Sequence, residues 1–527
     1  MSGKLFKSGV IVSSMTFLSR IMGLTRDVIV ANLLGAGGTA DVFLLANKIP
    51  NFLRRLFAEG AFAQAFIPML SEVHHQNDEQ QLRLFVARIA GTLGTLVMLV
   101  TLLGVIGSPI LAMLFANGWF IDYLNDGPDA DKYELTALML KITFPYLFFV
   151  TLTALSGAIL NTLNKFAVAA FTPVLLNVAI ISAALFLSPN LETPAIGLAW
   201  GVFLGGLIQF IFQIPFLAQT GLLVKPQWGW HDPQVSRVRK LMIPALFGVS
   251  VSQINLLFDT FIASYLQDGS ISWLYYSDRL LEFPLGLFGI AIATVILPTL
   301  SRNHAAQDHV KFSGNMDWSV KMVCLLGIPA ATGLIVLAEP MLLVLFQRGA
   351  FTPVDATMAS YSLIAYATGL LSFMLIKVLA PGFYSRQDVK TPVKFGIWAM
   401  LANMGFNVIF AYQYGYVGLA IATSLSALLN VSLLYQRLHR SGVYHCCSAT
   451  LLFIVRIGVA ALIMAAILSW LLPPVSEWLQ WSSWQQVSIL SAAILGAAIV
   501  FICSLFLVGA RPDALLRNQP ANTGAQQ

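Results

Sequence analysis

Residues 13–72 read SSMTFLSRIMGLTRDVIVANLLGAGGTADVFLLANKIPNFLRRLFAEGAFAQAFIPMLSE. The stretch contains two mainly apolar segments, each long enough to cross a bilayer, which takes about 20 residues of α-helix. Both segments nevertheless carry ionisable residues, namely Arg20, Arg26, Asp27, Asp41, Lys48, Arg54, Arg55 and Glu59. Because burying one charge in the middle of a membrane costs on the order of 3 kcal/mol, these residues are expected to have a function.

The composition of the whole chain indicates a membrane protein. Hydrophobic residues make up 57% of the 527 residues and charged residues only 10%, a balance that a water-soluble domain could not keep on its surface. The formal net charge of +6 is spread over short loops instead of forming a basic patch, so a nucleic-acid partner is not expected. The first segment has no signal-peptide cleavage site and is predicted to stay as a transmembrane helix.

We therefore predict an all-α polytopic membrane protein with about fourteen transmembrane helices. The predicted segments are residues 8–34, 40–70, 84–115, 135–160, 166–188, 194–218, 241–266, 271–300, 316–339, 355–379, 393–413, 415–436, 449–472 and 485–509. Prolines inside several segments, such as Pro145 and Pro284, are expected to kink or break them.

Loop charges orient these helices. Lys and Arg concentrate in the loops on the N-terminal side, from Lys4 to Arg517, whereas the opposite loops offer little beyond Lys132 and Arg348. The longest opposite loop, NGWFIDYLNDGPDADKYE, is acidic. Since short cytoplasmic loops are rich in Lys and Arg, both termini are predicted to be cytoplasmic.

The chain also repeats itself in the same orientation. Residues 37–72 align with residues 268–302, which places Lys48 opposite Arg279, and residues 197–222 match residues 418–443 at their ends. Chance similarity between apolar helices is the alternative explanation. Parallel repeats are typical of transporters, which predicts two six-helix lobes around a central cavity. The predicted domains are an N-terminal lobe (1–222), a C-terminal lobe (223–443), two appended helices (444–510) and a cytoplasmic tail without fixed structure (511–527).

The intramembrane charges favour one class of substrate. Cations predominate, and residues such as Arg20 and Asp27, seven positions apart, share a helix face on which they could pair. Several guanidiniums around a cavity suit an anion with bidentate oxygen geometry, above all a phosphate or diphosphate. The alternative is that Arg–Asp pairs only lock helices together. The cations are Arg20, Arg26, Lys48, Arg54, Arg55 and Arg279, and Arg54 is favoured over Arg55 as the cavity-facing residue. The nearby acids, Asp27, Asp41, Glu59, Asp278 and Glu282, are expected to have supporting or gating roles.

A second polar set is predicted on later helices. A carboxylate, two amides and a hydroxyl could bind Na⁺, or a proton at the carboxylate alone. Interhelical hydrogen bonding is the ordinary role of such residues. They are Asp259, Asn403, Asn407 and Thr423.

Signatures of enzymes are absent from the sequence. It contains no Gly-rich phosphate loop followed by Lys-Ser/Thr, no His/Cys metal-ligand spacing, and no histidine within the membrane segments. The aromatic run WLYYSDR (273–279) is expected to be an interfacial belt. No cofactor is predicted.

Three stretches resemble the MurJ/MviN family of bacterial lipid II flippases: residues 13–68, SWLYYSDRLLEFPLGLFGIAIATVILPTLS (272–301) and KVLAPGFYSRQDVKTPVK (377–394). The likeness runs through essentially all of the predicted helices. It implies the fold of the MOP exporter superfamily, and flipping of undecaprenyl-diphosphate-linked disaccharide pentapeptide from the cytoplasmic to the periplasmic leaflet for peptidoglycan synthesis.

The resemblance also implies roles for particular residues. The cavity cations of the family fall on Arg20, Arg26, Arg54 and Arg279, and the nearby functional acids are Asp27, Asp41 and Glu282. The last two helices would form a groove for the polyprenyl tail. Some relatives bind sodium in the second lobe, where Asp259, Asn403, Asn407 and Thr423 are similar.

These inferences lead to one functional hypothesis and its rivals. We expect a non-enzymatic, monomeric flippase of the bacterial inner membrane that works by alternating access, driven by Na⁺, H⁺ or the membrane potential. Its partners would be lipid II, membrane lipids and proteins of cell-wall synthesis. The rivals are a flippase for another polyprenyl-diphosphate-linked glycan, a same-fold ion-coupled antiporter, an enzyme acting on polyprenyl phosphates, and a scaffold of the cell-wall machinery.

Overall fold

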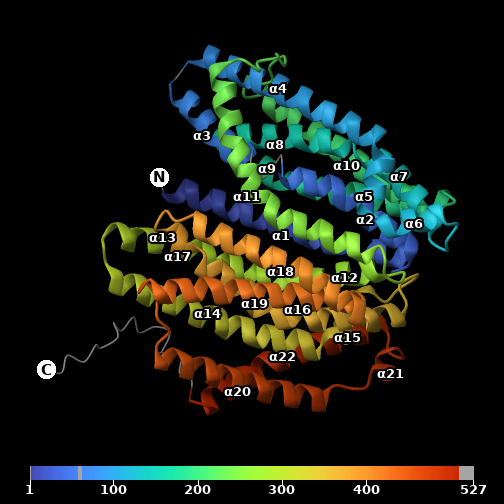
Figure 1. Ribbon diagram of the computed structural model, residues 1–527, viewed down its shortest axis with the longest axis vertical. Helices are drawn as coiled ribbons and strands as arrows, with labels where there is room; N and C mark the ends of the chain where they lie inside the picture. Colours follow the sequence, from blue (N-terminus) through green and yellow to red (C-terminus); the bar gives the residue numbers. More distant parts are fainter. Residues whose placement is uncertain (1, 57–61, 77, 510–527) are drawn as a thin grey trace. The chain divides into compact units, whose positions relative to one another are not determined.

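The computed structural model describes residues 2–56, 62–76 and 78–509 (Figure 1). Every regular element in these ranges is a helix, which confirms the all-α prediction. Glu59 and the predicted tail 511–527 lie outside the described residues.

The chain forms two compact units. The first comprises residues 1–272 and 348–352, and the second comprises residues 273–347 and 353–527. The first unit contains α1 (Ser2–Leu34), α2 (Gly38–Arg54), α3 (Phe62–His75), α4 (Glu79–Ile106), α5 (Ser108–Phe115), α6 (Asn117–Leu124), α7 (Ala130–Thr143), α8 (Tyr146–Thr162), α9 (Phe166–Ser182), the short η2 (Ala183–Leu187) and η3 (Ser188–Asn190), α10 (Pro194–Ala218) and α11 (Pro233–Ala263).

The second unit begins within α12, whose first turn lies in the first unit. Its helices are α12 (Ser270–Pro284), η4 (Leu285–Gly289), α13 (Ile290–Ala305), α14 (His309–Val336), α15 (Ala338–Phe346), α16 (Pro353–Leu379), α17 (Pro381–Tyr384), α18 (Lys390–Tyr414), α19 (Tyr416–Arg440), α20 (Ser448–Leu471), α21 (Val475–Trp478) and α22 (Ser483–Leu507). The last two long helices, α20 and α22, pack against each other and are drawn in red in Figure 1.

Packing divides the chain at a different place from the internal repeat. The repeat places the predicted lobe boundary at residues 222 and 223, whereas the compact units meet at residues 272 and 273. The reason is α11, which packs on α3, α4 and α5 of the first unit. The division into two repeated lobes stays a prediction.

Eleven helices or helix pairs in the described residues are long and apolar enough to cross a membrane. They correspond to eleven of the fourteen predicted segments, and the count of fourteen stays a prediction. The other three predicted segments fall on α1, on α2 with α3, and on α11. These helices carry ionisable residues within the predicted segments, and α2 is only 17 residues long.

Two of the predicted kinks coincide with breaks in the helices. Pro145 separates α7 from α8, and Pro284 ends α12 before the π-helical turn η4. A proline inside a helix lacks the N–H that would bond to the preceding turn, so a break or a π-turn is the expected response. The charged residues of α12 therefore precede an irregular segment.

Glycines let helices of the first unit approach closely. A Cβ atom at Gly201 of α10 would lie 2.7 Å from the Cβ of Ala183, and one at Gly205 would lie 2.6 Å from Leu176 Cδ1. Such contacts are too short for any side chain, so the glycines of α10 serve helix packing.

Candidate substrate-binding and gating sites

Arg26 and Asp27 form an ion pair on α1. Arg26 Nη2 lies 2.6 Å from Asp27 Oδ1, and Arg26 Nη1 donates to Asn177 Oδ1 of α9 at 3.1 Å. Asn177 in turn donates to the backbone carbonyl of Ser19 at 3.3 Å. Asp27 is only 3% exposed. The Arg26 guanidinium is therefore held between an acid on its own helix and a neutral amide on α9.

The predicted pairing between residues seven positions apart is absent. Asp27 pairs with Arg26, while Arg20 is exposed and forms no ion pair with any described residue. The physical reason is the helical rise, because seven residues span about 10 Å along the axis, which is too far for a direct contact.

Lys48 connects α2 with α11. Its Nζ donates to Thr260 Oγ1 at 2.7 Å, and Thr260 is 3% exposed. Thr260 also donates to the backbone carbonyl of Leu256. A buried hydroxyl thus fixes the direction of the ammonium group.

Asp41, at the start of α2, binds the start of α12. Its Oδ2 accepts from the backbone N–H of Gly269 at 2.8 Å, and its Oδ1 accepts from the backbone N–H and the hydroxyl of Ser272 at 2.8 and 2.5 Å. Asp41 is 3% exposed. A carboxylate stabilises the positive end of a helix, so Asp41 caps α12 from another element.

Arg54 and Arg55 differ in their surroundings. Arg54 is half-buried and its Nε donates to Asn51 Oδ1 at 3.1 Å, whereas Arg55 is exposed. The side-chain amide of Asn51 therefore helps to orient the Arg54 guanidinium. This difference agrees with the preference for Arg54, although the cavity-facing role stays a prediction.

Arg279 of α12 is oriented by a tyrosine one turn earlier. The hydroxyl oxygen of Tyr275 accepts from Arg279 Nε at 3.2 Å and from Nη2 at 3.0 Å, and Arg279 Nη1 donates to Glu282 Oε2 at 3.2 Å. Asp278 is half-buried beside Arg279 in the sequence. Tyr275 was missed as a partner, although its spacing of four from Arg279 on one helix face was a usable signal.

The aromatic run 273–279 is not an interfacial belt. Trp273 is 7% exposed and donates from Nε1 to Asp355 Oδ1 at 3.1 Å, and Tyr276 is fully buried. The prediction of a belt was wrong because two of the three aromatic rings pack inside the second unit instead of facing lipid.

Three residues of the predicted ion site meet in the second unit. Asn407 Nδ2 donates to Asn403 Oδ1 at 2.8 Å, and Asn403 Nδ2 donates to Thr423 Oγ1 at 3.4 Å and to Ser426 Oγ at 3.3 Å. Both asparagines are fully buried. Asp259 lies on α11 in the first unit. Within the described residues, no group of three His, Cys, Asp or Glu residues could hold a metal ion.

The four predicted substrate-binding arginines are divided between the units. Arg20, Arg26 and Arg54 belong to the first unit, and Arg279 belongs to the second. Arg26, Arg54 and Arg279 share one feature, a hydrogen bond to a neutral side-chain oxygen that orients the guanidinium.

A bundle of membrane helices that keeps arginines, a lysine and carboxylates within its spans has the character of a transporter. A family model described as "Lipid II flippase MurJ" matches residues 30–488. A protein of Vibrio cholerae named "Probable lipid II flippase MurJ" is 62% identical over 510 residues, which cover 97% of each chain. This chain therefore belongs to the MurJ family of lipid II flippases.

Further comparisons agree with this membership. A Burkholderia cenocepacia protein named "Lipid II flippase MurJ" is 37% identical over 95% of this chain and 96% of its own length. A solved structure of lipid II flippase MurJ in an inward closed conformation matches with a TM-score of 0.79 at 26% identity, covering 96% of this chain and 100% of that one. An inward-facing multidrug resistance MATE family transporter of the MOP superfamily matches with a TM-score of 0.68 at 12% identity, covering 82% of this chain and 98% of that one. The predicted MOP fold is confirmed.

Proposed function

We propose that this protein moves lipid II, the undecaprenyl-diphosphate-linked disaccharide pentapeptide, from the cytoplasmic to the periplasmic leaflet of the bacterial inner membrane by alternating access. Membership of the lipid II flippase family supports the substrate. Both termini would be cytoplasmic, as the loop charges predict. The protein would act as a monomer, without a catalytic step.

The observation that carries the mechanism is the way the arginines are held. Arg54 donates to the neutral oxygen of Asn51, Arg26 to Asn177, and Arg279 to Tyr275. Each partner helps to fix the direction of a guanidinium, and Arg26 and Arg279 also contact the carboxylates of Asp27 and Glu282. Guanidiniums fixed in this way suit bidentate binding of a diphosphate, since little side-chain entropy remains to be lost.

Release of the substrate would use the neighbouring acids. Asp27 and Glu282 already contact Arg26 and Arg279, at 2.6 and 3.2 Å. A state in which these carboxylates hold the guanidiniums more tightly would bind the diphosphate more weakly, and differential affinity between two states is what a transport cycle requires. Asp41, Lys48, Asp278 and Glu59 would have supporting or gating roles.

The polyprenyl tail would stay in the bilayer beside α20 and α22. These helices pack together, and both keep large apolar side chains exposed, such as Leu462 at 69% and Leu495 at 65%. An apolar surface of this kind suits a lipid chain. A gradient of Na⁺ or H⁺, or the membrane potential, would bias the cycle.

The test is depletion of the protein followed by an assay of the accessibility of lipid II to a periplasmic reagent. We expect lipid II to stay inaccessible, and complementation to fail with Arg26→Ala, Arg54→Ala or Arg279→Ala at normal expression. Arg55→Ala is the matched control and should complement. Normal exposure of lipid II in depleted cells that lack a second flippase would refute the function. Full complementation by the arginine variants would refute only the diphosphate clamp.

A same-fold ion-coupled antiporter is the second candidate, favoured by the likeness to a MATE family transporter of the MOP superfamily. A cavity for organic cations should be acidic, whereas the predicted cavity residues are mainly arginines. Export of cationic dyes by the purified protein in vesicles, without lipid II movement, would favour this candidate.

A further inference from the structure

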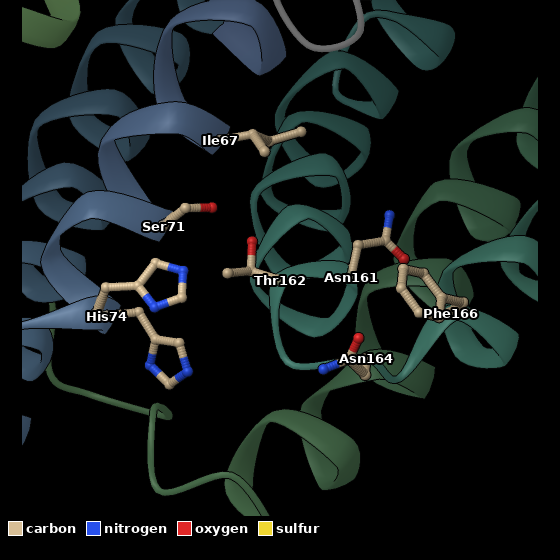
Figure 2. Close-up of a pocket in the computed structure, with 8 residues that line it drawn as sticks. Ile67, Ser71, His74, Asn161, Thr162, Asn164 and Phe166 are labelled. Carbon is tan, nitrogen blue, oxygen red and sulfur yellow. The ribbon is translucent and has the colours of Figure 1, made fainter. Parts of the chain in front are cut away.

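A polar pocket of about 440 Å³ lies within the first unit (Figure 2). It is formed by α3, the end of α8 and the start of α9, and all of its residues fall on the predicted cytoplasmic side of the chain. In Figure 2, Ser71 and His74 of α3 point toward Thr162 and Asn164 at the end of α8. Its lining residues are Ile67, Ser71, His74, His75, Asn161, Thr162, Asn164 and Phe166.

The described lining has an unusual chemical composition. It combines two amides, two hydroxyls and two imidazoles, and it includes neither a carboxylate nor a Lys or Arg side chain. The nearest charged residues in the sequence are engaged elsewhere: Glu72 accepts from Arg237 at 3.1 Å, and Lys165 donates to Gln219 at 3.5 Å. No negative group of the lining would oppose an anionic ligand.

The pocket also keeps hydrogen-bonding capacity. Within the described residues, the side-chain amides of Asn161 and Asn164 bond to no other protein group. Phe166 begins α9, and no side chain caps this helix, so its first N–H groups lack a side-chain acceptor. The imidazole rings of His74 and His75 each add an N–H donor. The lining therefore suits a ligand rich in carbonyl and carboxylate oxygens.

We propose that this pocket binds the peptide part of the transported headgroup, through its amide groups and a carboxylate. The inference rests on the proposed function. A diphosphate would favour Arg and Lys, which the described lining lacks. The volume falls within the range of pockets that enclose small ligands, about 300–1,000 Å³. A peptide of five residues spans up to about 17 Å when extended, so its end can lie in the pocket while the sugar stays outside.

The test uses the full-length protein in lipid nanodiscs and a soluble probe, the disaccharide pentapeptide without diphosphate or lipid. We expect the probe to bind, the pentapeptide alone to compete, and the disaccharide alone not to compete. Asn164→Asp should weaken binding about tenfold or more, because it places a carboxylate in the pocket. Asn164 has φ of 62°, and Gln387, in a loop of the second unit, has the same φ. Gln387→Glu is therefore the matched control and should leave binding unchanged.

Ser71→Asp provides a second variant on another element, in case Asn164→Asp fails to fold. Equal loss of binding in Gln387→Glu, full competition by the disaccharide alone, or absence of probe binding would each overturn the proposal. Arg54→Ala separates the two proposals, because the probe carries no diphosphate. Probe binding should therefore be unchanged in Arg54→Ala. This expectation holds whether or not that variant still transports lipid II.

Discussion

Asp41 accepts two hydrogen bonds from Ser272, one from its backbone N–H at 2.8 Å and one from its hydroxyl at 2.5 Å. Together with the bond from Gly269, they tie the start of α2 to the start of α12. Three donors converge on one buried carboxylate, so the contact should be strong in the state described and absent from any state in which α12 begins elsewhere. The gating role predicted for Asp41 can therefore be tested directly.

Asp41→Asn should expose the amide N–H groups of Gly269 and Ser272 to solvent exchange. Bonds to a charged acceptor contribute about 1.5–3 kcal/mol each, and an amide offers only one accepting oxygen. Hydrogen–deuterium exchange of the purified protein should show faster exchange at the first turn of α12. Asp268→Asn removes an exposed neighbouring carboxylate and should leave that exchange unchanged. Unaltered protection in Asp41→Asn would mean that the contact does not hold α12.

Tyr275→Phe should weaken lipid II binding while the protein still folds. The substitution removes the oxygen that accepts from Arg279 Nε and Nη2, and so frees the guanidinium to adopt other rotamers. Losing orientation at one arginine should cost about 1 kcal/mol, or roughly fivefold in affinity. Tyr412→Phe, at a tyrosine that is 93% exposed, is the control. Equal affinities in Tyr275→Phe and wild type would assign the tyrosine no positioning role.

Sodium should raise the unfolding temperature of the wild-type protein more than potassium does if the predicted ion site exists. A ligand that binds only the folded state stabilises it in proportion to the logarithm of its concentration. Asp259→Asn should abolish the difference between the two ions. If that variant keeps the sodium effect, Asp259 takes no part in the sodium site. If the wild-type protein shows no difference between the two ions, Asn403, Asn407 and Thr423 are better explained by their mutual hydrogen bonds.

The start of α14 should lose stability in acid. Asp308 accepts from the backbone N–H of Lys311 at 2.9 Å, and this bond, with the Lys311 ammonium group, holds the pKa of the carboxyl below its usual value. Because the folded-state pKa is the lower one, the stabilisation is present above about pH 4, the ordinary aspartate pKa, and is lost as the pH falls through the lowered value. Exchange at the Lys311 amide should report this loss. Asp308→Asn, which can still cap the helix, should remove the pH dependence.

Much of the fold could be predicted from the sequence, whereas the pairing of side chains could not. Charges within apolar segments singled out Arg26, Asp41, Lys48 and Arg54 as functional candidates, because placing a charge within a membrane is costly. Their partners depend on tertiary packing. Asn177 lies 151 residues from Arg26 and Thr260 lies 212 residues from Lys48, so no periodicity on one helix could reveal either contact.

In two places, the aromatic run around Trp273 and the pocket near Ser71, the sequence led to a wrong prediction or to none. The run around Trp273 looks like a lipid-facing belt by composition, yet the indole is buried and donates a hydrogen bond to the carboxylate of Asp355. The pocket near Ser71 was missed because ordinary serine, asparagine and histidine residues form it. Such residues attract attention only once three helices bring them together.

The packing of α11 on α3, α4 and α5 has a practical consequence for dissecting this protein. A chain cut for co-expression as two fragments after residue 222, the edge of the repeat, would strip α11 from helices whose apolar faces it covers. A cut between α11 and α12, at residues 264–268, would keep α11 on the fragment that it packs against, and only the short segments 269–272 and 348–352 of the first unit would be on the other fragment. The edge of the predicted repeat and the boundary of the packed units thus fall at different places in the chain, and fragment complementation should follow the packing.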